Sequence, residues 1–279
     1  MPQSPVFTLE PPRATWSSGA WLQLALGLAA VGGGTALSGH ALDRAWCLDL
    51  NAALSAWPQS WSFLTWSALG ICSALLLTAL SAREPRRVAA LVMALILGGL
   101  LVHVLKRSLQ VERPLAVFGP DHPLFHVIGD RLHKGSMPSG HSATAFAIAG
   151  LMVWREQGRP LSRHLWWVWA ALQALSRIAV GAHWPSDVLA GSGIGMMLAP
   201  LVWRLPPTTW LTTRLDRPAV RGAMAGVLPV WGLGVCLADL GWPLPAWCQL
   251  AVMALSVAGA WQWWRSARPR PRSQGMSCA

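Results

Sequence analysis

The sequence contains no tyrosine, only two lysines, and eleven acidic residues in 279 positions. Charged residues of all kinds make up 12% of the chain, whereas hydrophobic residues make up 53%. So few charged groups cannot cover the surface of a soluble protein of this size. The composition therefore excludes an ordinary soluble domain and favours a protein with several membrane-spanning helices.

Cysteine is also scarce, and its spacing excludes a zinc site. The five cysteines form no Cys-x2-Cys pair, and no histidine lies at a suitable spacing from them. We expect them to be small packing residues. Cys236 and Cys248 could meet near one membrane face, and the sequence leaves open whether they pair.

The net charge of +11 raises the question of a nucleic-acid partner. The basic residues, however, are spread over short loops between apolar runs rather than gathered in one segment. This distribution indicates membrane topology, and no nucleic-acid partner is expected.

The apolar runs predict an all-α fold, a polytopic bundle of membrane helices. Eight helices are expected, at about residues 20–38, 61–81, 88–105, 140–154, 165–181, 187–203, 222–238 and 246–264. The first six would form a core over residues 20–203, and the last two a C-terminal helix pair within residues 204–264. A tail at 1–19 and a basic tail at 265–279 would flank them, both in the cytoplasm.

Arginines in the connecting segments predict the orientation of this bundle. They concentrate in the loops that follow the second, fourth and sixth helices and in the C-terminal tail. The positive-inside rule makes these regions cytoplasmic. The loops at 39–60, 106–139, 182–186 and 239–245 then lie outside. The loop at 106–139 is itself basic, which opposes the rule unless its cations are kept for a ligand.

The segment from Ser176 to Asp187 is the first candidate for chemistry. It contains the pattern Ser-Arg-x5-His-x3-Asp, formed by Arg177, His183 and Asp187. A carboxylate four positions after a histidine can hold one ring nitrogen and leave the other as a nucleophile or base. Pro185 fits best in the first turn of the next helix, with His183 just outside it.

Two further motifs lie at the ends of apolar runs. Six residues separate Lys106 from Arg113-Pro114, and Pro138-Ser139-Gly140-His141 opens the fourth run. Lysine and arginine side chains suit phosphate oxygens, and a guanidinium can bind two of them at once. Free backbone N–H groups at a helix start, here Ser139 and Gly140, also favour an anion. The three stretches together indicate a site for a phosphate group.

Together the three motifs resemble the signature of the type 2 phosphatidic acid phosphatase (PAP2) family, over about residues 60–203. The resemblance implies a membrane lipid phosphatase that needs no metal or other cofactor. It implies that His183 attacks phosphorus to form a phosphohistidine, that Asp187 orients His183, and that His141 protonates the leaving oxygen. The phosphate-binding residues would be Lys106, Arg113, Ser139, Gly140 and Arg177.

The loop at 106–139 holds a further group of histidines and charged residues that could suggest a metal site. The segment is rich in proline and glycine, so a solvated rim of the active site is the better interpretation. The group comprises Asp121, His122, His126, Asp130, Arg131 and His133.

The expected substrate is a lipid phosphate or pyrophosphate at the outer face of a bacterial inner membrane, with undecaprenyl pyrophosphate first. Lipid A 1-phosphate, phosphatidylglycerol phosphate and phosphatidic acid are alternatives, as is phosphate transfer from one lipid to another. A non-enzymic lipid transporter is a further alternative. It is disfavoured because the motif residues lie at helix ends rather than at the bilayer midplane. Beyond the substrate and membrane lipids no partner is expected, and the sequence does not indicate an oligomeric state.

Overall fold

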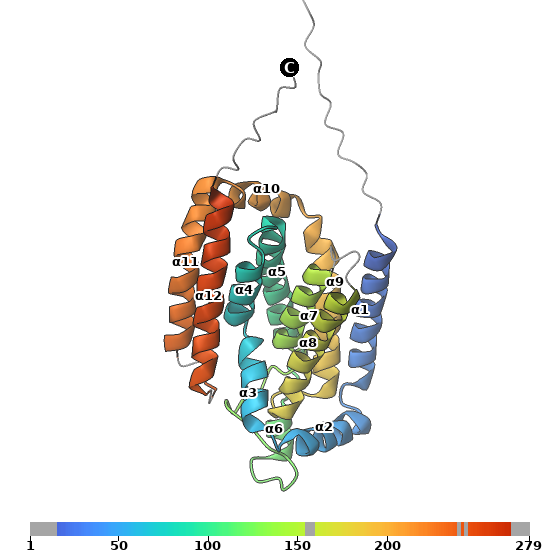
Figure 1. Ribbon diagram of the computed structural model, residues 1–279. Coiled ribbons are helices and arrows are strands. Elements are labelled where there is room, and N and C mark those ends of the chain that lie inside the picture. The colour runs from blue at the N-terminus through green and yellow to red at the C-terminus, as the bar shows by residue number, and fades with distance from the viewer. Residues whose placement is uncertain (1–15, 154–159, 239–240, 243–244, 269–279) are drawn as a thin grey trace, which may run out of the picture.

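The computed structural model describes residues 16–153, 160–238, 241–242 and 245–268, and these residues form helices and no strand. The all-α prediction is confirmed (Figure 1). Most of the expected N-terminal tail and much of the basic C-terminal tail lie outside the described residues. The helices are α1 (Ser18–Leu37), α2 (Ala41–Leu54), α3 (Pro58–Ser67), α4 (Gly70–Leu80), α5 (Pro85–Leu109), α6 (Pro114–Phe118), α7 (Gly140–Val153), α8 (Pro160–Ala179), α9 (Pro185–Trp203), α10 (Pro206–Leu215), α11 (Pro218–Leu237) and α12 (Ala246–Ala267).

The outer surface of the bundle is apolar. Large side chains such as Leu100, Val230 and Leu250 are 61%, 70% and 71% exposed. Among the described helices, α1, α5 continued by α6, α9 and α11 are each long and apolar enough to cross a bilayer, and α3 with α4 would make a fifth span. Apolar helices with apolar outward faces are the solution that a hydrocarbon environment requires. The protein is therefore an integral membrane protein.

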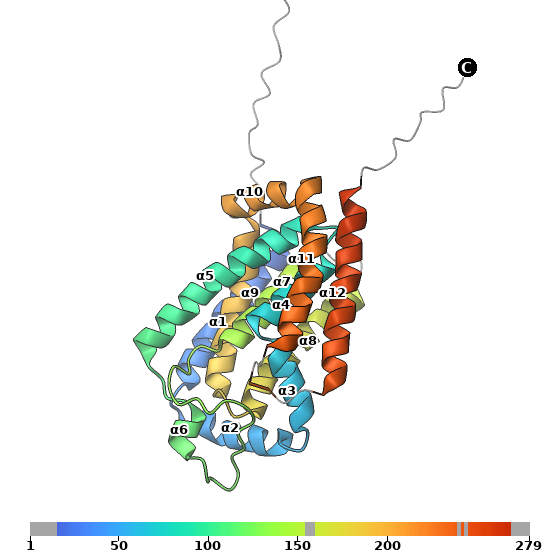
Figure 2. The same cartoon turned by 90° about the vertical axis from the view of Figure 1, so that its left-hand side faces the viewer.

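Several helices differ from the eight spans expected. The 14-residue α7 is apolar but only ~21 Å long, and α8 and α12 are long enough but less apolar. In contrast, α5 has 25 residues instead of the 18 expected, and it crosses the bundle obliquely (Figure 2). Its C-terminal turn carries Lys106, which begins the Lys-x6-Arg-Pro motif. In chain order this is the first motif, Pro-Ser-Gly-His is the second, and Ser-Arg-x5-His-x3-Asp is the third.

The run at 61–81, expected as one helix, is broken. Its two halves, α3 and α4, are bent by 69°. The Ser73 hydroxyl donates to the Ser67 carbonyl at 2.8 Å, and the Gln173 amide donates to the Ser67 hydroxyl at 2.8 Å. These side-chain contacts satisfy polar groups at the break. The hydropathy of the run does not report such contacts, so it did not predict the bend.

Three helices were not expected. They are α2, α6 and α10, and they lie in segments that hydropathy marks as loops. In Figure 1, α2 and α6 lie at one end of the bundle and α10 lies at the other. They are too short or too polar to span a bilayer, which is why a search for apolar runs passes over them.

Small residues let α9 pack closely between α1 and α7. A Cβ atom at Gly191 would lie 2.3 Å from the carbonyl oxygen of Ser139. One at Gly195 would lie 2.2 Å from the carbonyl oxygen of Ala143. Such backbone contact is typical of membrane helices with small residues at their interface. It brings the start of α7 against α9, where two of the motifs lie.

The C-terminal pair, α11 and α12, packs side by side and joins the core through α4. The Trp263 indole N–H donates to the Thr78 carbonyl at 2.9 Å, which fixes α12 to the end of α4. Cys236 and Cys248 are both free thiols, so they do not pair.

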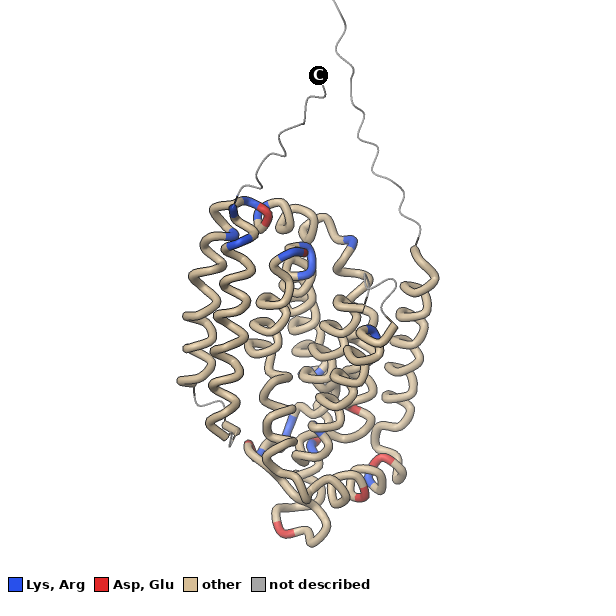
Figure 3. Tube along the Cα trace, viewed as in Figure 1, with Lys and Arg blue, Asp and Glu red and all other residues tan. Residues whose placement is uncertain are grey.

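Lysine and arginine gather at the end of the bundle where α10 lies (Figure 3). The N-terminal end of α1 and the C-terminal end of α12 lie at this same end. The opposite end holds the cations of the motifs. The described arginines around the connection from α4 to α5, around α10 and at the end of α12 are Arg83, Arg86, Arg87, Arg204, Arg214, Arg217, Arg221, Arg265 and Arg268.

Candidate active site

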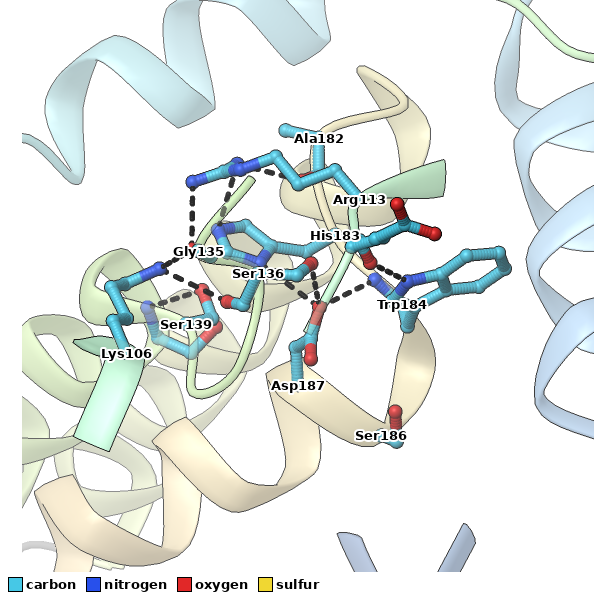
Figure 4. Close-up of polar contacts among 12 residues, drawn as sticks. Lys106, Arg113, Gly135, Ser136, Ser139, Ala182, His183, Trp184, Ser186 and Asp187 are labelled. Atoms are coloured by element: carbon cyan, nitrogen blue, oxygen red, sulfur yellow. Dashed lines mark hydrogen bonds and ion pairs between the residues drawn. The ribbon is translucent and has the colours of Figure 1, made fainter. Parts of the chain in front are cut away.

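Residues of the three motifs come together in one cluster (Figure 4), at the end of the bundle opposite α10 (Figure 1). Lys106 lies in the last turn of α5, and Arg113 immediately precedes α6. Gly140 begins α7, Arg177 lies in the last turn of α8, and His183 lies in the connection from α8 to α9. Five chain segments thus supply one cluster.

His183 and Asp187 form the buried pair that the spacing predicted. Their Nδ1 and Oδ2 atoms are 3.2 Å apart. As expected, Pro185 is the first residue of α9 and His183 lies just outside the helix. The same Oδ2 atom accepts the Trp184 backbone N–H at 2.9 Å and the Ser136 hydroxyl. The carboxylate is therefore held by three donors.

The contact with Asp187 determines which nitrogen of His183 carries the hydrogen. A carboxylate accepts only, so Nδ1 donates and the lone pair is left on Nε2. The Nη1 atom of Arg113 lies 3.4 Å from that Nε2 atom. Burial, followed by the nearby cations Arg113 and Lys106, holds the pKa of His183 well below its ordinary value of 6.5. At neutral pH the imidazole is uncharged, with its free nitrogen facing a guanidinium.

Backbone carbonyls, rather than carboxylates, hold the two cations of the first motif. Arg113 donates from Nε to Lys134 at 3.0 Å, and from Nη1 to Ala182 at 2.8 Å. The Nζ atom of Lys106 donates to the carbonyl of Gly135, which also accepts from Nη2 of Arg113 at 3.3 Å. Within the described part of the chain neither cation has a carboxylate partner, so their positive charge remains available to an anion.

Arg177 is buried beside them. Its Nη1 atom donates to the Thr65 hydroxyl at 2.6 Å, and its guanidinium carbon lies 5.6 Å from the centre of the Trp242 ring. Its Nε atom has no hydrogen-bond partner among the described residues. Neither Thr65 nor Trp242 belongs to a motif, so sequence reasoning missed both. Trp242 comes from the connection between α11 and α12, which places the C-terminal pair at the rim of the site.

The Pro-Ser-Gly-His motif lies against the third motif. The Ser139 backbone N–H donates to the carbonyl of Asp187 at 2.9 Å. The Ser139 hydroxyl accepts from Ser142, from its N–H at 3.4 Å and from its hydroxyl at 3.0 Å, so Ser139 caps α7. The buried Nε2 atom of His141 has no partner among the described residues. An unpaired buried nitrogen of this kind is suited to a ligand that supplies its partner.

The histidines and acidic residues of the 106–139 loop do not gather into a second site. Among the described residues, no group of three or more His, Cys, Asp or Glu side chains could hold a metal ion. His126 instead uses its backbone, with its N–H bound to Asn51 at 2.7 Å. The backbone carbonyl of His133 accepts the N–H of Arg113 at 2.9 Å. The loop thus supports the first motif through its main chain.

Comparison with known proteins bears on the same segments. Residues 87–211 match the model of the PAP2 superfamily. A decaprenylphosphoryl-5-phosphoribose phosphatase of Mycobacterium tuberculosis is 34% identical over 105 residues, 38% of this chain and 55% of that protein. A lipid A 1-phosphatase of Rhizobium johnstonii is 31% identical over 147 residues, 47% of this chain and 57% of that protein. The chain thus spans little more than half the length of these curated relatives.

Among solved structures, the crystal structure of Aquifex aeolicus LpxE aligns with 66% of this chain and 96% of that chain, at 23% identity and a TM-score of 0.40. The likeness to the PAP2 superfamily comes from the sequence match. Lys106, Asp187 and every motif residue between them lie inside the matched segment. Through residues 87–211, the chain resembles the PAP2 superfamily.

Proposed function

We propose that this protein is a membrane phosphatase that removes phosphate from a lipid phosphate or pyrophosphate. The observation that carries the proposal is the uncharged, buried His183, whose free Nε2 atom faces Arg113 beside Lys106. A nucleophile with a lone pair surrounded by cations suits attack on an anionic phosphorus centre. Both curated relatives described above are named as phosphatases, which supports the same reaction class.

In the first step, the phosphate would displace the contact between Arg113 and Nε2 of His183. Nε2 attacks phosphorus, and a nitrogen–phosphorus bond forms as the bond from phosphorus to the lipid oxygen breaks. His141, protonated when the anionic phosphate is bound, gives its proton to that leaving oxygen and becomes neutral. Asp187 keeps the Nδ1 hydrogen in place and stabilises the positive ring. The product is a lipid alcohol, or a lipid monophosphate when the substrate is a pyrophosphate.

In the second step, water attacks the phosphohistidine. His141, now neutral, accepts a proton from the water as the nitrogen–phosphorus bond breaks. Inorganic phosphate leaves, and Nε2 of His183 regains its lone pair. Both steps use the same two histidines, which approach from the start of α7 and the connection before α9.

Phosphate binding would rest on charge and on the start of α7. Lys106, Arg113 and Arg177 supply three positive groups, and Ser139 and Gly140 supply backbone N–H groups near the helix start. Three fixed cations can stabilise the charge on the phosphoryl oxygens, which is the part a metal ion would otherwise play. The proposal therefore assigns no metal or other cofactor.

A groove beside the phosphate site favours a lipid as substrate. A cavity of about 270 Å³ between α4, α5 and α7 has a lining that includes Gly140, Gly99, Val102, Ala147 and Gly70. Its lining is mostly apolar, so a hydrocarbon chain could lie there while the phosphate contacts the cations. A soluble phosphate ester would leave this groove unused.

Undecaprenyl pyrophosphate remains the first proposed substrate. The relative named for a decaprenylphosphoryl compound favours a polyprenyl lipid, whereas the relative named for lipid A favours lipid A 1-phosphate as the second candidate. Arginines at the α10 end favour a cytoplasmic location for that end. The proposed site then faces the periplasm from the bacterial inner membrane.

The test is phosphate release by purified protein and by its His183→Ala variant in detergent with EDTA. The substrates are undecaprenyl pyrophosphate, lipid A, phosphatidylglycerol phosphate and phosphatidic acid. We expect release by the wild type alone, undiminished by the chelator. Appearance of phosphate on an acceptor lipid instead of in solution would indicate a phosphotransferase. Movement of lipid across proteoliposomes without cleavage would contradict the proposal.

A further inference from the structure

The unexpected helix α2 has one buried polar face. Asp43, Cys47 and Asn51 are 2%, 0% and 0% exposed and lie four residues apart, on one side of the helix. Most other side chains of α2, including Asp49, are exposed. Burying a carboxylate and an amide is unfavourable unless both are hydrogen bonded. Their partners therefore show what this face is for.

Asp43 binds the start of α9. Its Oδ1 atom accepts the backbone N–H of Ser186 at 2.9 Å, and its Oδ2 atom accepts the Ser186 hydroxyl at 2.5 Å. Ser186 adjoins Asp187 in the first turn of α9, and Figure 4 shows it set apart from the contact between Asp187 and His183. Asp43 thus fixes the turn that carries the catalytic carboxylate without touching the reacting groups.

Asn51 binds the end of α8. Its amide nitrogen lies 3.0 Å from the carbonyl oxygens of both Ile178 and Ala179, in the last turn of that helix. It also lies 2.9 Å from the His126 carbonyl, while the amide oxygen accepts the His126 N–H at 2.7 Å. The same side chain therefore secures α8 and the loop that follows the first motif.

The two contacts lie on either side of the connection that holds His183. Carbonyls at a helix end and N–H groups at a helix start lack partners within their helices. One rigid helix supplies both sets of partners here, from Asp43 and Asn51, which are eight residues and ~12 Å apart along its axis. The separation between the end of α8 and the start of α9 is set by that distance.

We propose that α2 is a positioning element of the active site, in which Asp43 and Asn51 hold the two helix ends so that His183 is aligned with phosphorus. The inference rests on the proposed function. It goes beyond the three motifs, because α2 lies outside the segment that matches the family. Displacing a reacting group by 1 Å can cost ~100-fold in rate, so a small change in this spacing matters.

The test compares Asp43→Ala and Asn51→Ala with Asp49→Ala, a matched control on the exposed face of the same helix. We expect kcat of the first two to fall ~10- to 100-fold, with KM within about threefold, because the phosphate-binding cations are untouched. The control keeps wild-type values. Asp43→Asn retains one acceptor for Ser186 and recovers part of kcat.

Amide deuterium exchange supplies a readout that needs no activity. The Ser186 N–H should exchange faster in Asp43→Ala, and the His126 N–H faster in Asn51→Ala, with neither changed in the control. Values of kcat within about twofold of the control would overturn the inference. So would a loss of folded protein at unchanged kcat per folded molecule.

Two further arms keep the test decisive. If Asp43→Ala does not fold, Ser186→Ala is measured in its place, with the same expected fall in kcat, and Asp43→Asn with a smaller fall. If the wild type cleaves no lipid at all, the proposed function fails and the exchange data decide the role of α2. Unchanged exchange at Ser186 then overturns the inference, and faster exchange supports it.

Discussion

Replacing Asp187 by Asn separates the shape of the site from its charge. The Oδ2 atom of Asp187 accepts from His183, Trp184 and Ser136, whereas its buried Oδ1 atom has no hydrogen-bond partner among the described residues. An amide oxygen in the Oδ2 position keeps all three contacts, and the amide nitrogen takes the unpaired position. The variant therefore retains the geometry and removes the negative charge.

The expected loss follows from the distance between the two groups. In the proposed mechanism, the ring of His183 becomes positive as it bonds to phosphorus, 3.2 Å from the carboxylate. With an effective dielectric constant of ~20, this attraction is worth ~5 kcal/mol. Since every 1.36 kcal/mol changes a rate tenfold, kcat of Asp187→Asn should fall by about 10³- to 10⁴-fold.

The assay is a rapid-quench measurement with lipid carrying radioactive phosphate. It records both kcat and the acid-labile, base-stable phosphohistidine. Asp216→Asn, in the segment after α10, serves as the control and should behave as the wild type. A fall of less than about tenfold in folded Asp187→Asn would refute the electrostatic reasoning, because it would leave the carboxylate no role beyond hydrogen bonding.

Three further predictions test packing, protonation and anion binding. Gly191→Ala should lower both the Tm and the activity, because its Cβ atom would lie 2.3 Å from the Ser139 carbonyl, whereas Gly226→Ala, with no atom within 4 Å, should lower neither. NMR titration of the ¹³C-labelled imidazole of His183 should show a neutral ring at pH 6.5, because its lowered pKa leaves it unprotonated above that value, and a midpoint at or above 6.5 would contradict this. Vanadate should inhibit competitively with the lipid and more weakly in Arg113→Ala, and equal inhibition of both proteins would place vanadate elsewhere.

The local part of the site was predictable because its residues lie close together along the chain. Asp187 lies four positions after His183, so the spacing predicts their pairing. Pro185 lies between them and can begin a helix, so the start of α9 is predicted as well. The prediction that Ser139 and Gly140 lie at the start of α7 is confirmed in the same way. Convergence of the motifs at one end followed from the alternation of helices across the membrane.

The supporting contacts were not predictable because they join distant segments. Thr65 meets Arg177 from 112 positions away, and Asp43 meets Ser186 from 143 positions away. Hydropathy identifies residues that avoid water, but in a bilayer it does not determine which helix packs against which. It also passes over short polar helices such as α2.

The place of Trp242 beside Arg177 has a consequence for how the protein is made. The chain is synthesised from its N-terminus, so all three motifs are made before the hairpin of α11 and α12. Arg177 acquires its aromatic neighbour only when α11 and α12 have inserted and their connection has reached the opposite end of the bundle. A nascent chain that stops after α9 therefore carries all the proposed phosphate-binding residues but lacks Trp242, and the site gains this aromatic side chain only when the hairpin of α11 and α12 is added.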